Sequence, residues 1–211
     1  MRKPFPEPAV LDVLRQNPSH VFVDVGANYG DYCRKLWRNY SRIIALEPNP
    51  EAFCILRSLY GWRSFFNHFE PYQCAASDMN GSTFLYLNPD KARCNGSADT
   101  IEPVFDYRPI SHPEISQRWD YRGSTRVRRE TVEARRLDSL LSTVKETIDM
   151  KIDVEGAELR VLRGTYGILD RVKRIIVELH DRENKGILES LLSAWFETRW
   201  IDQDHILGVK R

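Results

Sequence analysis

The stretch VFVDVGANYGDY, residues 21–32, points most directly to the fold. Its apolar first half belongs to the run 20–25, which is typical of a buried strand, and Gly26 and Gly30 then bound a turn of small residues. A helical spacing of largely apolar residues follows the turn, at Cys33, Leu36, Trp37 and Tyr40. The stretch therefore predicts a strand, a glycine turn and a helix in immediate succession.

The same succession continues toward the C-terminus. Residues 42–46 (RIIAL) predict a second strand, and Asn49 followed by Pro50 is typical of a helix start. We expect further strands over residues 73–76, 83–87, 126–136, 147–154 and 174–179, helices over 137–144, 155–169 and 187–195, and a closing hairpin within 198–210. Strands that alternate with helices favour an α/β domain.

The composition favours one domain. The 211 residues, 42% of them hydrophobic, can bury one sizeable core but hardly two, so we expect a single domain over residues 1–211. The 31 basic and 30 acidic side chains leave a formal charge of +1, which provides no overall field toward nucleic acid or a membrane surface. The N-terminus has no signal-peptide pattern and no apolar run has membrane length, so a cytoplasmic location is expected.

The turn after the first strand suits a ligand that approaches the backbone closely. Gly26, Ala27 and Gly30 place little side-chain volume there, and glycine permits unusual torsion angles. Asn28 stands where the dinucleotide fingerprint GxGxxG requires glycine, so a pyrophosphate ligand is disfavoured. Glycine also occurs in ordinary strand–helix turns, so the turn alone leaves a purely structural role open.

Carboxylates flank this turn and end the second strand. Asp24 and Asp31 add negative charge beside the turn, which suits a ligand with an ammonium or sulfonium group. Glu47 lies at the carboxyl edge of the expected sheet, where such an acid accepts both hydroxyls of a ribose. Ser77 and Asp78 follow the third expected strand, where a side chain commonly meets an adenine amino group, although a turn-forming aspartate is an equal alternative. These residues predict a site for a nucleoside with a charged amino-acid tail.

Several motifs carry a family resemblance. VFVDVGANYGDY resembles the first motif of class I S-adenosylmethionine-dependent methyltransferases, and IIALEPNPEAF resembles the second. MKIDVEGAELRVLRG, residues 150–164, closely resembles the signature segment of the FkbM family, whose members are mostly O-methyltransferases. CAASDMNGSTFLYL, RRLDSLL and IIVELH match in the expected order, so the resemblance spans roughly residues 20–210, with a poor match between 88 and 126.

The resemblance implies a fold, a cofactor and a reaction. The fold is a doubly wound, seven-stranded, mostly parallel sheet with one antiparallel strand near the C-terminus, which agrees with the expected hairpin. The cofactor is S-adenosylmethionine, and the acceptor is usually a hydroxyl group of a sugar or natural product. The protein is therefore expected to be an O-methyltransferase acting on a small molecule.

Methyl transfer to a hydroxyl requires a base near the carboxyl edge of the sheet. His180 is the first choice because its ordinary pKa lies near neutrality, and Asp153 or Glu155 is the alternative, with Asp153 expected near the cofactor as well. Glu155 and Glu158 can equally be acids that favour a helix dipole in its first turn, and His180 can be a hydrogen-bonded strand end. Asp153, Glu155 and Glu178 offer oxygen ligands for Mg²⁺, but no spacing demands a metal, and none is expected.

Residues 88–126 break the pattern of strands and helices. A long irregular segment in a compact domain is usually a lid or binding loop, so we expect an inserted loop here that binds the acceptor. Glu130 and Glu133 interrupt the arginine-rich stretch that follows, which favours a solvated polar strand over an RNA-binding surface. RNA methylation, or a non-catalytic module that keeps the nucleoside site, stay as alternatives.

Overall fold

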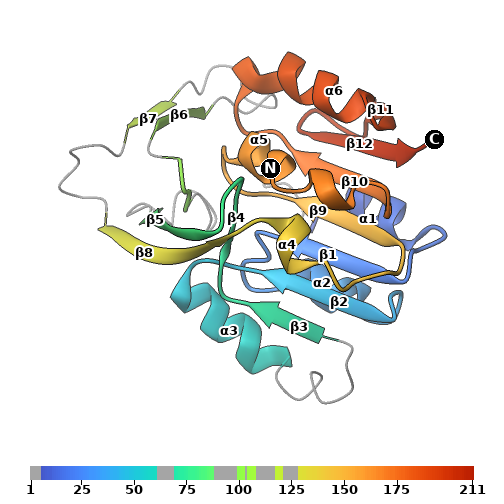
Figure 1. Ribbon diagram of the computed structural model, residues 1–211, viewed down its shortest axis with the longest axis horizontal. Coiled ribbons are helices and arrows are strands. Elements are labelled where there is room, and N and C mark those ends of the chain that lie inside the picture. The colour runs from blue at the N-terminus through green and yellow to red at the C-terminus, as the bar shows by residue number, and fades with distance from the viewer. Residues whose placement is uncertain (1–5, 61–68, 88–98, 103, 108–116, 121–127) are drawn as a thin grey trace.

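The computed structural model describes residues 6–60, 69–87, 99–102, 104–107, 117–120 and 128–211. Within these residues a seven-stranded main sheet has the order β11-β12-β10-β9-β1-β2-β3 (Figure 1). Its strands are β1 (Val21–Val25), β2 (Arg42–Leu46), β3 (Phe69–Tyr72), β9 (Ile148–Ile152), β10 (Val172–Glu178), β11 (Phe196–Trp200) and β12 (His205–Lys210). Among these described strands, β12 alone runs opposite to the other six. The predicted mostly parallel sheet with an antiparallel strand near the C-terminus is confirmed.

Helices cover both faces of the main sheet. Apolar side chains of α1 (Pro8–Arg15), α2 (Asp31–Leu36) and α3 (Pro50–Tyr60) pack on one face, and those of α4 (Leu137–Leu140), α5 (Glu158–Arg163), η2 (Tyr166–Ile168) and α6 (Lys185–Ser193) pack on the other. A short helical turn, η3 (Arg182–Asn184), precedes α6. The doubly wound arrangement is therefore confirmed.

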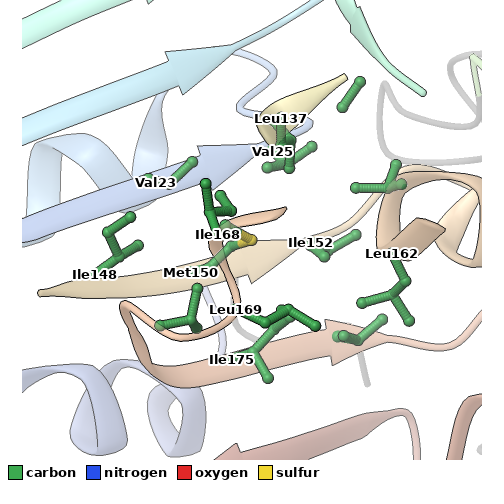
Figure 2. Packing of buried hydrophobic residues seen from close by; sticks show 14 of the residues in the cluster. Val23, Val25, Leu137, Ile148, Met150, Ile152, Leu162, Ile168, Leu169 and Ile175 are labelled. Carbon is green, nitrogen blue, oxygen red and sulfur yellow. The ribbon is translucent and has the colours of Figure 1, made fainter. Parts of the chain in front are cut away.

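The strand sequences explain why both faces are covered. In β1, Val21, Val23 and Val25 contribute to one core cluster, whereas Phe22 contributes to the other. Successive side chains of a strand point to opposite faces, so a continuous apolar run needs helices on both sides. Figure 2 shows Met150 of β9 near Ile168, and Ile175 of β10 near Leu169. Each fully buried aliphatic side chain contributes roughly 1.5–3 kcal/mol to folding.

A smaller sheet adjoins the main one, with the order β4-β8-β5. It consists of β4 (Ala75–Ala76), β5 (Gly81–Leu87) and β8 (Arg128–Arg135), and Figure 1 shows β5 and β8 at the left of the molecule. Leu85 and Val132 are buried beneath it, while Arg128 and Arg135 pair with Glu130 and Glu133 on its surface. The polar strand predicted for the arginine-rich stretch is confirmed over the described residues.

Two element predictions need correction, and one helix was not predicted. The third strand of the main sheet is β3, not residues 73–76, of which Ala75–Ala76 form β4 in the smaller sheet. The β3 sequence FEPY contains a glutamate and a proline, which are unusual in a strand. Pro71 is tolerated because β3 is an edge strand. The helix expected from residue 155 begins only at Glu158, and α1 was not predicted because the prolines around it obscured its apolar face.

The segment 88–126 contains regular structure, contrary to the expected irregular loop. Strands β6 (Val104–Tyr107) and β7 (Gln117–Asp120) form an antiparallel pair, seen at the upper left of Figure 1. Thr100 is buried and pairs with Tyr86, and Ile101 is buried under the smaller sheet. The rest of this segment lies outside the described residues, so its binding of an acceptor stays a prediction. None of the described helices is long and apolar enough to cross a membrane.

Candidate functional site

The glycine turn connects β1 to α2 at the carboxyl edge of the main sheet. Gly26, Asn28 and Gly30 have positive φ angles of 80°, 49° and 79°. The backbone N–H groups of Gly26 and Ala27 donate to the Leu46 carbonyl at 3.0 and 2.9 Å, which fixes the turn against the end of β2. A Cβ atom on Gly26 would lie 1.8 Å from the Asp153 carbonyl oxygen. Glycine is therefore required where the turn packs against the end of β9.

Glu47 joins the ends of β1 and β2. Its carboxylate accepts the Asn28 N–H at 2.7 Å through Oε2 and the Asn49 N–H at 2.8 Å through Oε1. Burial raises the pKa of Glu47 to about 7, although these two N–H groups favour the ionised form. The Asn49 side chain caps α3 and also donates to Asp99 at 2.5 Å. The structure thus brings Glu47 and the predicted turn into direct contact.

Asp24 lies beneath the turn, within the interior. It is 1% exposed and accepts a hydrogen bond from the Cys33 Sγ at 3.2 Å. Burial raises its pKa, while the positive charge of Lys151, its register partner on β9, opposes the rise. Lys151 is 1% exposed, and its Nζ donates to Asp153 Oδ2 at 2.9 Å and lies 4.6 Å from the Tyr32 ring centre. Asp24 therefore has partners within the chain, and its role toward a cationic ligand stays a prediction.

Sequence reasoning did not single out Lys151. It interrupts the strand Ile148–Ile152, whose residues are all buried. A charged residue in such a run predicts a buried ionic partner, because an unpaired charge in the interior is costly. That signal was available in the sequence, but its partners Asp24 and Asp153 could be identified only from the sheet register.

The remaining predicted cofactor residues have partners within the chain. Asp31 begins α2 and pairs with Arg34 at 2.5 Å. Ser77 is buried and donates to Asp78 Oδ1 at 3.1 Å, and Arg160 Nε donates to the same oxygen at 3.1 Å. Partial burial opposes ionisation of Asp78, but Arg160 holds its pKa below the usual range. The role of Asp78 at an adenine stays a prediction.

Carboxylates surround His180 immediately beyond β10. Its Nδ1 lies 2.8 Å from Glu158 Oε1, and its Nε2 lies 3.3 Å from Glu155 Oε2 and 3.6 Å from Asp153 Oδ1. Glu178 Oε1 is 3.9 Å from the same Nε2. Burial alone would lower the pKa of His180, but these carboxylates raise it well above its ordinary value. Both ring nitrogens therefore face carboxylates, which favour the charged form of the ring.

The backbone before α5 places these acids. Glu155 has a φ of 53° and Gly156 a φ of 102°, so the chain makes a left-handed turn before the helix begins. The Glu158 carboxylate is buried and accepts the Gly156 N–H at 2.9 Å. Glu158 thus contacts His180 directly and is more than an acid near a helix start. Sequence reasoning missed this because the pairing depends on residues 22 positions apart.

The Asp153 carboxylate is the link between the two parts of the site. Its Oδ2 accepts from Lys151 and its Oδ1 faces His180. Burial opposes its ionisation, but Lys151 and His180 lower the pKa of Asp153 to about 2. One ligand-type atom each from Asp153, Glu155 and His180 lie within 4.8 Å of one another, so this group could also hold a metal ion.

Comparisons with known proteins give matches to methyltransferases. The sequence profile of the methyltransferase FkbM domain matches residues 24–198. The chain is 27% identical to the 2-O-methyltransferase NoeI of Sinorhizobium fredii over 188 residues, covering 81% of this chain and 67% of that protein. It is 30% identical to the methyltransferase sdnD of Sordaria araneosa over 175 residues, covering 76% of this chain and 67% of that protein.

Solved structures show the same fold at low sequence identity. The methyltransferase FkbM from Methylobacillus flagellatus KT superposes with a TM-score of 0.55 at 17% identity, and the match covers 90% of this chain. It covers 43% of that longer chain, so this protein spans less than half of it. An rRNA methylase from Streptococcus thermophilus gives a TM-score of 0.51 at 12% identity, over 100% of this chain and 99% of that one. At these identities the similarity concerns the fold alone.

Proposed function

The chain belongs to the methyltransferase FkbM domain family, and from this premise we propose that it transfers a methyl group from S-adenosylmethionine to a hydroxyl group of a small molecule, a sugar or natural product. The observation that carries the proposal is that the Glu47 carboxylate accepts the N–H of Asn28, in the turn after β1, and the N–H of Asn49, after β2. A relative named as a 2-O-methyltransferase supports oxygen as the acceptor atom.

The residues present fit the nucleoside part of this cofactor. Glu47 combines a carboxylate with a position at the sheet edge, where a ribose can donate its two hydroxyls. The positive φ angles of Gly26, Asn28 and Gly30 curl the backbone so that a ligand can approach it without meeting bulky side chains. We assign the amino-acid end of the cofactor to this turn and to Asp153. When bound, S-adenosylmethionine supplies an electrophilic methyl group on a sulfonium.

The carboxylates around His180 accept the proton that the acceptor hydroxyl loses. Both nitrogens of His180 already face carboxylates, so the ring holds Glu155 and Asp153 in place rather than taking a further proton. Glu155 is our choice as the proton acceptor, because Lys151 and His180 lower the pKa of Asp153 to about 2, which makes Asp153 a weak base. With S-adenosylmethionine bound, Glu155 would take the proton of the acceptor hydroxyl as the new C–O bond replaces the C–S bond, and the donor would leave as S-adenosylhomocysteine. His180, the first choice from the sequence, stays a prediction as the base.

Thermal unfolding with S-adenosylhomocysteine tests the cofactor proposal. A ligand at about 100 times its dissociation constant stabilises a protein by roughly 2.7 kcal/mol. We expect the wild type and Glu51→Ala, an exposed acid in the same α3 turn region, to gain stability, and Glu47→Ala to gain little. A gain with NADH instead, or none in the wild type, would rule out the proposal.

Turnover tests the proton acceptor once a panel of hydroxylated sugars and an RNA transcript has identified the acceptor. Glu155→Gln is expected to lower kcat by about 10²–10⁴-fold while the response to S-adenosylhomocysteine persists. Glu197→Gln, an exposed acid on β11, serves as the control and should change neither quantity. If His180→Gln alone abolishes turnover and Glu155→Gln has full activity, His180 is the base. Methylation of the RNA and of no sugar would contradict the proposed acceptor class.

A further inference from the structure

A second group of ligand-type side chains lies beside the His180 cluster. It combines Glu7, which directly precedes α1, with Glu178 at the end of β10 and His205 at the start of β12. One ligand atom from each residue lies within 4.8 Å of the others. Glu178 and His205 are register partners on neighbouring strands, so the sheet itself holds them side by side. We propose that these three side chains bind a divalent transition-metal ion of the Zn²⁺ type.

The orientation of His205 is the main support for this site. Its side chain is fully buried, and its Nδ1 lies 2.9 Å from Asp202 Oδ1. The same carboxylate accepts the backbone N–H groups of Asp204 and His205, so it is fixed in place. With Nδ1 held by Asp202, Nε2 faces Glu178 at 3.3 Å, and an ion bound there would replace the proton on Nε2. Metal-bound histidines characteristically have such a carboxylate on their other nitrogen.

The Nε2 atom of His205 lacks a hydrogen bond among the described residues. Glu178 Oε2 is 3.3 Å away, but its direction does not satisfy hydrogen-bond geometry. A buried nitrogen without a partner is costly, and an ion between the two groups would satisfy it. Ligands bound at about 2.0–2.2 Å in a tetrahedral site lie roughly 3.4 Å apart, close to the 3.3 Å between His205 Nε2 and Glu178 Oε2.

Glu7 is also held by a neighbour. Tyr32, a buried residue of α2, donates its hydroxyl to Glu7 Oε2 at 2.5 Å. The donor set is thus one imidazole and two carboxylates, which suits Zn²⁺, Co²⁺ or Mn²⁺ better than the oxygen-preferring Mg²⁺ and Ca²⁺. Because the ligands come from opposite ends of the chain, the ion would bind the folded protein and attach the start of α1 to the C-terminal strands. It would lie next to His180, which is 3.9 Å from the other Glu178 oxygen.

Metal titration of the full chain, stripped with a chelator, tests the site without any methyl-transfer assay. We expect one equivalent of Co²⁺ to bind with a visible absorption band, Zn²⁺ to displace it, and a millimolar excess of Mg²⁺ to leave it in place. His205→Gln and Glu7→Gln should each weaken binding by at least about tenfold, and Asp202→Asn by about 10–100-fold. Glu7→Gln retains an oxygen for Tyr32 and lies near the chain terminus, so it tests the site even if His205→Gln does not fold.

His180→Gln is the matched control, because it removes a histidine that neighbours Glu178 but is not a proposed ligand. It should leave Co²⁺ binding within about twofold. Loss of binding in this variant with retention in His205→Gln would assign the ion to Asp153, Glu155 and His180 and overturn the proposal. Lack of stoichiometric Co²⁺ binding by the wild type would also overturn the proposal. Neither result affects the response to S-adenosylhomocysteine, so this site and the proposed function fail separately.

Discussion

Two glycines of this chain have opposite structural roles. A Cβ atom on Gly26 would overlap the Asp153 carbonyl, and its φ is 80°, whereas a Cβ on Gly186, within α6, has no neighbour within 4 Å. Gly26→Ala should cost roughly 3 kcal/mol or more and abolish cofactor binding. Gly186→Ala should stabilise the protein by about 0.5–1 kcal/mol. Urea unfolding of both variants measures this contrast, and equal effects would contradict it.

Ionisation of Glu47 is expected to make stability depend on pH. Burial raises its folded-state pKa from 4.5 to about 7, so the folded protein binds more protons than the unfolded chain between these values. The stabilisation from this group is complete below pH 4.5 and is lost as the pH rises through 7. The contribution of Glu47 to the free energy of unfolding changes by about 3 kcal/mol at most across this pH range.

Comparison with Glu47→Gln isolates this contribution from other titrating groups. The free energy of unfolding of the wild type, relative to that of the variant, should fall between pH 5 and pH 8. Chemical denaturation at each pH gives the difference. A difference that does not change with pH would show that Glu47 titrates normally in the folded protein.

At the scale of elements, a buried ion pair attaches α1 to the sheet. Asp149 on β9 is fully buried and accepts from Arg174 Nε at 2.9 Å, from Tyr40 at 3.0 Å and from the Ser19 hydroxyl at 2.8 Å. Arg174 also donates to the carbonyl oxygens of Val13 and Gln16 at the end of α1, each at 2.6 Å. One carboxylate thus organises two strands and the helix that precedes them.

Removal of Asp149 alone should therefore lower the stability of the protein more than removal of both Asp149 and Arg174. Asp149→Ala leaves the Arg174 charge buried without its carboxylate, which is expected to cost about 3–5 kcal/mol. The double variant Asp149→Ala, Arg174→Met should be less destabilised than Asp149→Ala, because no isolated charge remains. Thermal unfolding of the two single variants and the double variant measures the coupling. Additive losses would show that the pair is not coupled.

At the scale of the whole molecule, the β6–β7 pair is peripheral to the two core layers. Val104 and Asp120 are antiparallel partners, so the chain leaves and re-enters this pair at neighbouring points. Replacing residues 103–121 with a short Gly-Ser linker should leave the fold and the response to S-adenosylhomocysteine intact. Transfer to the acceptor should fall, because this segment is predicted to bind it. Full activity of the shortened protein would remove the segment from the acceptor site.

The sequence by itself determined most of the alternating strands and helices, the doubly wound sheet through the family resemblance, and the position of Glu47 at the carboxyl edge of that sheet. These features depend on local periodicity and on motifs such as MKIDVEGAELRVLRG, in which every necessary residue lies within a few positions of the next. Strand β3 was not predicted because the proline and glutamate in its sequence are not typical of a strand. Helix α1 was not predicted because the prolines around it obscured the apolar spacing of its residues.

Only the tertiary structure decided the chemical partners within the site. Lys151 meets Asp24 through sheet register, Glu158 meets His180 across the turn before α5, and Glu7 approaches His205 from the other end of the chain. Periodicity shows which face of an element is buried but not which charged groups will share that interior. Packing sets those distances, and through them the protonation of each group, because burial and neighbouring charge together determine a pKa.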